Sequence, residues 1–79
     1  MYAVSVEFDM NSDGFDLGAV FDAEKHVREH GWADEYDAGS GFGFRDLTFY
    51  CKDEATAWNI IEFMRIVGCC NDRIYEVED

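Results

Sequence analysis

The stretch that most constrains the fold is residues 39–51, which read GSGFGFRDLTFYC. A glycine-rich tip precedes a strand whose side chains alternate between the two faces of a sheet. One face would carry Phe42, Phe44, Asp46, Thr48 and Tyr50, and the other Arg45, Leu47, Phe49 and Cys51. Because large apolar groups fall on both faces, the strand belongs near the middle of a sheet, or keeps one face for a partner.

The first of two predicted amphipathic helices covers residues 16–30. Asp16 is its N-cap and Gly31 its stop. Glu24 falls near the middle of the inner face and stands four residues before Arg28, which is the spacing of a helical ion pair. The apolar residues of the inner stripe are Leu17, Val20, Phe21, Ala23 and Val27.

The second predicted helix runs from a cap at Asp53 to about Val67 and stops at Gly68. Apolar residues recur at about 100° per residue and form one arc. The arc holds Ala57, Ile60, Ile61, Phe63, Met64 and Val67. Trp58 and Ile66 fall on the opposite face of the helix, without an obvious place in the core.

Three further strands complete the pattern. Residues 2–9 alternate cleanly between apolar and polar side chains. Residues 32–38 predict an edge strand protected by acids, residues 39–41 a hairpin tip, and residues 73–77 a final strand. The order βαββαβ is that of the ferredoxin-like α+β sandwich, a four-stranded antiparallel sheet with two helices on one face. Right-handed crossovers place the first and third strands at the centre of the sheet.

The charge restricts the class of partner. The 79 residues predict a single domain, with 18 acidic and six basic residues and a net charge of −12. So few cations disfavour direct binding to nucleic acid or to an anionic membrane, and so many acids favour a basic partner. The alternative is that the acidity only keeps a protein of a salt-adapted proteome in solution.

The cysteines indicate a reducing compartment. Cys51, Cys69 and Cys70 are odd in number and two are adjacent, which is a poor framework for disulfides. With no transmembrane run or targeting segment evident, we expect a cytoplasmic protein, in the host cytoplasm if a phage encodes it. Cys69 and Cys70 offer thiols for a soft metal or for oxidation, and structural thiols are the favoured alternative.

Two segments have the donor spacing of metal sites. Residues 9–14 look like the start of a calcium loop, but Val20 stands where the closing glutamate is needed. His26 and His30 have the H-x-x-E-H spacing of some zinc peptidases, with Asp22 one turn earlier as a third ligand. A polar turn and a solvated helix face explain the same residues without a metal, so we expect no cofactor.

The opening stretch also resembles RNA-recognition-motif domains. Gly41-Phe42-Gly43-Phe44 matches the core of the signature that these domains carry on their third strand. The resemblance implies that Phe42 and Phe44 stack on bases. The signature differs from this sequence at Ser40, Arg45 and Leu47, and the chain is strongly acidic. The match therefore supports the fold more than it supports RNA binding.

The remaining features predict a surface for a protein partner. No nucleophile lies near a base in the sequence and no glycine loop suits phosphate, so we expect no enzyme. Carboxylates would replace phosphates on a basic nucleic-acid-binding protein, with aromatic side chains as anchors. The candidate contacts are Asp13, Asp16, Asp22, Asp34, Glu35, Asp37, Phe42, Phe44, Trp58, Glu76 and Glu78.

In size and acidity the chain is similar to small phage-encoded inhibitors of the anti-CRISPR and DNA-mimic kind. This similarity implies a target with a basic groove that normally holds nucleic acid. The alternative is a structural or regulatory domain that forms a homodimer through the open face of its sheet. Such a homodimer would depend on Phe44, and it would gain stability as salt screens the repulsion between acids.

Overall fold

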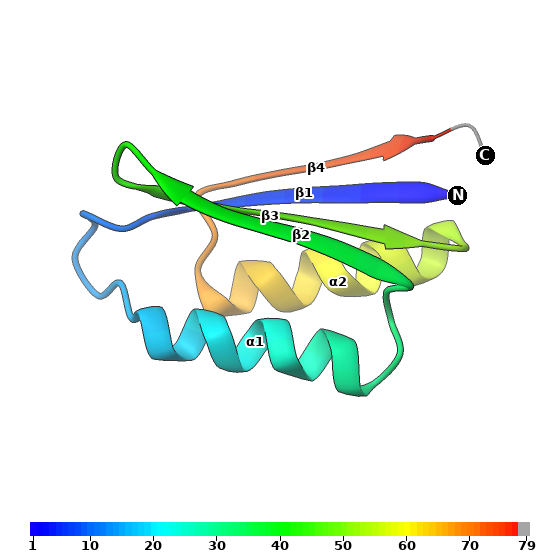
Figure 1. Ribbon diagram of the computed structural model, residues 1–79, viewed down its shortest axis with the longest axis horizontal. Helices are drawn as coiled ribbons and strands as arrows, with labels where there is room; N and C mark the ends of the chain where they lie inside the picture. Colours follow the sequence, from blue (N-terminus) through cyan, green and yellow to red (C-terminus); the bar gives the residue numbers. More distant parts are fainter. Residues whose placement is uncertain (78–79) are drawn as a thin grey trace.

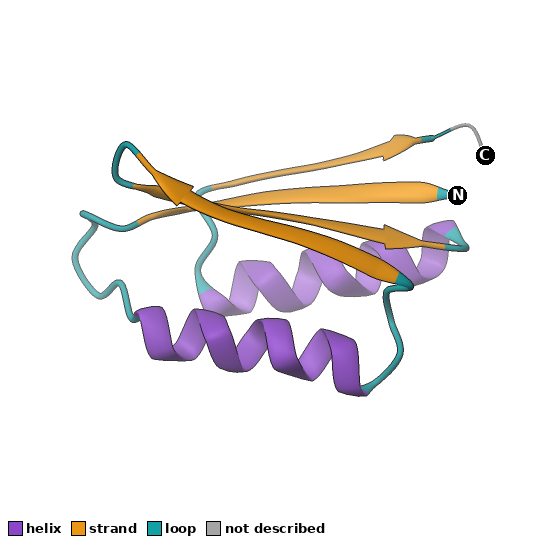
Figure 2. Cartoon of the chain, viewed as in Figure 1, coloured by secondary structure: helices purple, strands orange, loops and turns teal. Residues whose placement is uncertain are grey.

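The computed structural model describes residues 1–77 and confirms the predicted fold class. Its elements are β1 (Tyr2–Asp9), α1 (Leu17–Glu29), β2 (Glu35–Gly41), β3 (Phe44–Cys51), α2 (Glu54–Val67) and β4 (Asn71–Glu76). The strands form one antiparallel sheet in the order β2-β3-β1-β4. Both helices lie on the same side of this sheet (Figures 1 and 2), so the fold is ferredoxin-like and β1 and β3 are central, as predicted.

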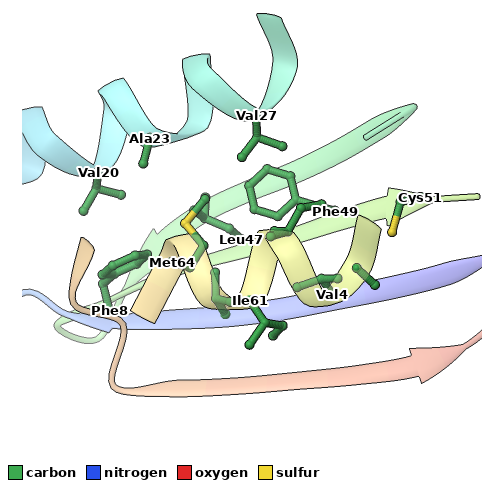
Figure 3. Packing of buried hydrophobic residues seen from close by; sticks show 13 residues of the cluster. Val4, Phe8, Val20, Ala23, Val27, Leu47, Phe49, Cys51, Ile61 and Met64 are labelled. Carbon is green, nitrogen blue, oxygen red and sulfur yellow. The ribbon is translucent and has the colours of Figure 1, made fainter. Parts of the chain in front are cut away.

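The core lies between the two helices and the sheet face beneath them. Alternate residues of β1 and β3 point into it, because successive side chains of a strand face opposite ways. Figure 3 shows these strand residues meeting the apolar stripes of α1 and α2. The cluster consists of Val4, Val6, Phe8, Val20, Ala23, Val27, Leu47, Phe49, Cys51, Ala57, Ile60, Ile61 and Met64.

Local signals define the ends of both helices. The Asp16 carboxylate accepts a hydrogen bond from the amide of Ala19 at 3.3 Å, and Asp53 accepts one from Thr56 at 2.8 Å. The bonds from Thr56 lower the pKa of the Asp53 carboxyl, because they stabilise its charged form. Gly68 ends α2 with φ 116°, a left-handed conformation that favours glycine. Both predicted caps are confirmed.

The inner face of α1 differs from the prediction. Leu17 and Phe21 are 40% and 47% exposed, while Glu24 is only 4% exposed and takes a place in the interior. Arg45, which points toward the helices from β3, explains this burial. Its guanidinium donates two hydrogen bonds to the Glu24 carboxylate, at 3.1 and 2.9 Å. Glu24 therefore pairs across the core, and Arg28 instead donates to the hydroxyl of Tyr36 at 3.2 Å.

The β2–β3 hairpin also differs from the prediction. Its tip is Phe42-Gly43, not residues 39–41, and both tip residues have a left-handed backbone, with φ 54° and 81°. Two-residue hairpin turns require this conformation, because it matches the twist of the paired strands. As a result β2 extends through residues 39–41 and starts three residues later than predicted. Phe42 leaves the sheet face that we expected it to share with Phe44.

The start of the last strand shifts as well. β4 begins at Asn71 rather than at residue 73, because Asn71 and Asp72 pair in register with Glu7 and Val6 of the central strand. Trp32 and Ala33, expected in the second strand, lie in the connection before it and pack against the core. The amide of Trp32 donates to the carbonyl of Val27, so this connection folds back onto the end of α1.

The buried ion pair gives a test of the packing. Replacing Arg45 alone by methionine leaves the Glu24 carboxylate buried without a cation, which should lower the free energy of unfolding by about 3–5 kcal/mol. The double variant Glu24→Leu with Arg45→Met removes both charges and should lose much less. Urea denaturation followed by circular dichroism measures both losses. A double variant as unstable as the single one would contradict a direct dependence of Glu24 on Arg45.

Candidate partner-binding surface

The sheet has a second face, directed away from the helices, which we call the open face. Within residues 1–77, no helix or strand covers it (Figure 1). The pairing register between the strands decides which side chains share this face. They are Ala3, Ser5, Glu7 and Asp9 of β1, Glu35 and Asp37 of β2, Phe44, Asp46, Thr48 and Tyr50 of β3, and Asn71, Arg73 and Tyr75 of β4.

The open face is strongly acidic. It carries five carboxylates, with Arg73 as the cation among the residues named above. The Arg73 guanidinium lies 5.1 Å from the centre of the Tyr75 ring, over its face. The carboxylates are those of Glu7, Asp9, Glu35, Asp37 and Asp46. A surface of this sign attracts cationic groups and repels phosphates.

Two of these carboxylates stand directly opposite each other on the central strands. Glu7 of β1 pairs in register with Asp46 of β3, an arrangement that is unfavourable when both are charged. A hydrogen bond with Asp46 raises the pKa of Glu7, and partial burial and the charges of Asp46 and Asp9 raise it further. A cation bound between the two side chains would relieve this repulsion.

A shallow groove crosses the open face beside this pair. Its volume is about 450 Å³, and it runs between β3, β1 and β4. The residues that line it are Ser5, Glu7, Asp46, Asn71 and Arg73 of the open face, together with Val6 and Asp72, whose positions in the register belong to the helical side. This lining is mostly polar, which suits a charged or hydrogen-bonding group of a partner better than an apolar ligand.

The structure gathers only some of the predicted contact residues. Glu35, Asp37 and Phe44 share the open face, and Asp34 directly precedes β2. Asp13, Asp16, Asp22 and Trp58 belong to the β1–α1 loop and to the helical layer. Glu76 faces the helical side of β4, opposite Tyr2 in register, and Glu78 lies outside the described residues.

Sequence reasoning missed Glu7, Asp9 and Asp46 as contact residues. Their alternation along each strand already placed them on outer faces. The meeting of Glu7 with Asp46 depends on the register between β1 and β3, which are separated by a helix and a strand in the chain. The sequence of each strand therefore indicated that these acids face outward. It did not indicate that the strands bring them together into one acidic surface.

Phe42 stands at the tip of the hairpin, fully exposed. The tip is held in place by the β1–α1 loop, since the amide of Met10 donates to the carbonyl of Gly43 at 2.8 Å. The Asn11 side chain lies so close to Gly43 that a Cβ there would approach it to 2.5 Å. Phe42 is thus a projecting ring on a supported turn. The resemblance to RNA-recognition-motif domains implied that Phe42 and Phe44 share one strand. Here only Phe44 lies on β3, and Phe42 lies in the turn before it.

The segments with metal-like spacing have other contacts. The Asp9 carboxylate accepts from the amide of Asn11 at 2.9 Å, and its carbonyl accepts from Ser12, as in a polar turn. The rings of His26 and His30 stack at 3.9 Å, beside Trp32 and Phe63. In the part of the chain that the structure describes, no three His, Cys, Asp or Glu side chains are arranged to hold a metal ion.

The three cysteines are free and differ in environment. Cys51 is buried, and desolvation raises the pKa of its thiol. Burial, together with the nearby Asp72 carboxylate, raises the pKa of Cys69 to about 11. Both groups are therefore protonated at neutral pH, which makes them poor nucleophiles and poor metal ligands. Cys70 is exposed, and its thiol donates to the carbonyl of Glu7 at 3.2 Å.

The raised pKa of Cys69 predicts a loss of stability at high pH. Between about pH 9 and pH 11 the unfolded chain releases this proton while the folded chain keeps it, so stability falls as pH rises. Urea denaturation at pH 8, 9, 10 and 11 measures the fall. Cys69→Ala should show a smaller fall over the same range. An unchanged fall in this variant would assign the effect to other groups.

No helix among the described residues is long and apolar enough to cross a membrane. Comparison of the sequence with models of known protein families gives no match, and a search of curated proteins gives none either.

Proposed function

We propose that this protein is a small, non-catalytic binding protein whose open face occupies a basic, nucleic-acid-binding surface of a partner protein. The observation that supports the proposal best is the uncovered open face itself, with five carboxylates and one cation. On this proposal the protein acts as an inhibitor, because it takes the place of the nucleic acid. Its mode of action would be that of anti-CRISPR and DNA-mimic proteins.

The state of the basic residues supports a protein partner over a nucleic acid. Three of the six bases are held in ion pairs with acids of the same chain. These pairs are Lys25 with Glu29, Arg45 with Glu24, and Arg65 with Asp72. Binding to phosphates requires cations that are free to displace counterions, and such cations are scarce here.

The spacing of the carboxylates supports the comparison with a nucleic acid. Glu35 and Asp37 are two residues apart on β2, and Glu7 and Asp9 are two apart on β1. Residues two apart on a strand are separated by about 6.4–6.8 Å. Each of these two strands therefore presents a pair of negative groups in line, which offers a basic groove the same sign of charge as a phosphate backbone.

The conformation of Phe42 indicates a role outside the fold. Among the described residues it is the one non-glycine residue with positive φ, and its ring is fully exposed. This turn position prefers asparagine or glycine, and a phenylalanine there is unfavourable. The turn requires this backbone conformation but not a phenylalanine in it, and residues held in unfavourable conformations occur often at binding sites. We therefore assign Phe42 as an aromatic anchor beside the acidic face.

The charge on the open face argues against a homodimer formed by two such faces. Joining them would bring five carboxylates of one copy against five of the other, with one arginine on each side. Like charges brought together and removed from water are strongly unfavourable. A basic partner provides the opposite charge and avoids this cost.

Displacement of DNA tests the proposal. Labelled duplex DNA is bound to two basic probes, a nucleoid protein of the HU type and a guide-loaded Cas9 complex, and this protein is added as competitor. We expect it to displace DNA from at least one probe at 50 mM salt. The affinity of this protein for that probe should be at least about tenfold weaker at 200 mM salt. No displacement from either probe at low salt, or displacement that salt does not change, would overturn the proposal.

A matched pair of variants tests the location of the contact. Glu7→Gln with Asp46→Asn neutralises two acids of the open face, and Asp22→Asn with Glu62→Gln neutralises two exposed acids of the helical layer. Both change the net charge by the same amount. The open-face variant should displace DNA about tenfold less well than the helical variant. Equal losses would mean that net charge acts, and not the open face.

Replacement of Phe42 separates binding from folding. Phe42→Asn relieves the left-handed phenylalanine and should raise the free energy of unfolding by about 1 kcal/mol. If the ring is an anchor, the same variant should bind at least about tenfold less tightly. Phe42→Ala is the control, because it removes the ring but keeps a Cβ in the unfavourable conformation. Unchanged binding in both variants would remove Phe42 from the contact.

A further inference from the structure

The outer edge of β2 is a second surface without a partner. β2 is the terminal strand of the sheet, and among residues 1–77 it pairs only with β3. All its residues are exposed except Tyr36, which is half-buried. An edge of seven residues presents a row of backbone groups with which another strand can pair.

The opposite edge of the sheet differs in its side chains. On β4, Asp72 points toward the helical layer and accepts two hydrogen bonds from Arg65, both at 2.9 Å. Charged residues that point inward are a common protection of sheet edges. The end of β2 instead reads Ala38-Gly39-Ser40-Gly41, and its register with β3 runs without a bulge. Small side chains and an unbroken register leave this end of the edge accessible. The acids that precede it, Glu35 and Asp37, repel other acidic strands but do not oppose a basic one.

The hairpin turn determines which backbone groups point outward. A two-residue turn with positive φ at both positions closes on Gly41 and Phe44 as a hydrogen-bonded pair. Because antiparallel ladders alternate, the amide and carbonyl groups of Ser40 and Ala38 are directed away from β3. These groups stand beside the smallest side chains of the strand, so the side chains of β2 itself do not block an added strand there.

The charges beside this edge determine the chemistry of the added strand. Glu35 and Asp37 lie on the open-face side of β2, two residues apart. A strand paired with β2 would place every second side chain against them, where lysine or arginine forms cross-strand ion pairs. On the helical side, the half-exposed ring of Phe21 lies 4.8 Å from the Arg45 guanidinium, next to Ser40 in register. Apolar side chains suit that side.

We propose that the β2 edge binds an extended segment of the partner in which lysine or arginine alternates with apolar residues, so that the segment becomes a fifth strand. The inference rests on the proposed function, because the segment belongs to the same basic partner. Main-chain hydrogen bonds to Ala38 and Ser40 provide affinity, and Glu35 and Asp37 select the basic residues. A second copy of this chain is a poorer occupant, because each copy carries a charge of −12.

Two synthetic peptides test this inference without any nucleic acid. One has the sequence Lys-Val-Lys-Thr-Lys-Val-Lys, and the other has the same residues in the order Lys-Lys-Lys-Lys-Val-Val-Thr. The alternating peptide should bind at least about fivefold tighter, because only it can pair every lysine with the acidic side of β2. Hydrogen exchange measured by NMR should show new protection at the amides of Ala38 and Ser40.

Two variants identify the groups that hold the peptide. Ala38→Pro removes one outward amide without removing a bond to β3, and should abolish the preference for the alternating peptide. Glu35→Gln with Asp37→Asn leaves the backbone intact and should weaken binding about tenfold. Protection of β3 amides in the free variants shows that the hairpin is folded. The second variant keeps the test decisive if Ala38→Pro disturbs the strand.

Several outcomes would overturn the inference. Equal binding of the two peptides would show an attraction of charge alone, and protection confined to β4 would place the strand at the other edge. Sedimentation that shows a dimer whose β2 amides are protected would assign the edge to a second copy. Because the peptide test and the DNA displacement test use different ligands, each can fail while the other succeeds.

Discussion

Two helices cover only one face of a four-stranded sheet. The position of the core and that of the candidate binding surface both follow from this one-sided arrangement. Thirteen buried side chains lie between the helices and the covered face. No helix or strand within residues 1–77 forms a layer on the other face. The arrangement that produces the core therefore also produces the open face. Its carboxylates make that face a surface for cations.

The ion pair between Glu24 and Arg45 connects the covered layer to the hairpin. In the sequence each residue is an irregularity, an acid in the apolar stripe of a helix and a base in the core positions of a strand. Together they satisfy each other through two hydrogen bonds. Arg45 also donates to the hydroxyl of Ser40 at 2.9 Å, so the pair holds both strands of the hairpin against α1. The position of the β2 edge and of its neighbouring acids depends on this contact.

The candidate site was only partly predictable. Glu35, Asp37 and Phe44 were expected as contact residues and share one face, because strand alternation is a local property. Trp58 was expected with them, but it belongs to the helical layer. The pair Glu7 and Asp46 was not expected, because their meeting depends on pairing between segments almost forty residues apart. Surface charge was readable from composition, while its concentration on one face was not.

The sequence by itself determined the element order, both helix caps, the glycine stop of α2 and the faces of the central strands. These features depend on residues a few positions apart, and their energies are local. Only the tertiary structure decided that Glu24 is buried, that Phe42 projects from the turn, and that five carboxylates gather on the open face. The physical reason is that each depends on strand register or on contact across the core, where the energy of the whole arrangement outweighs the preference of a single residue.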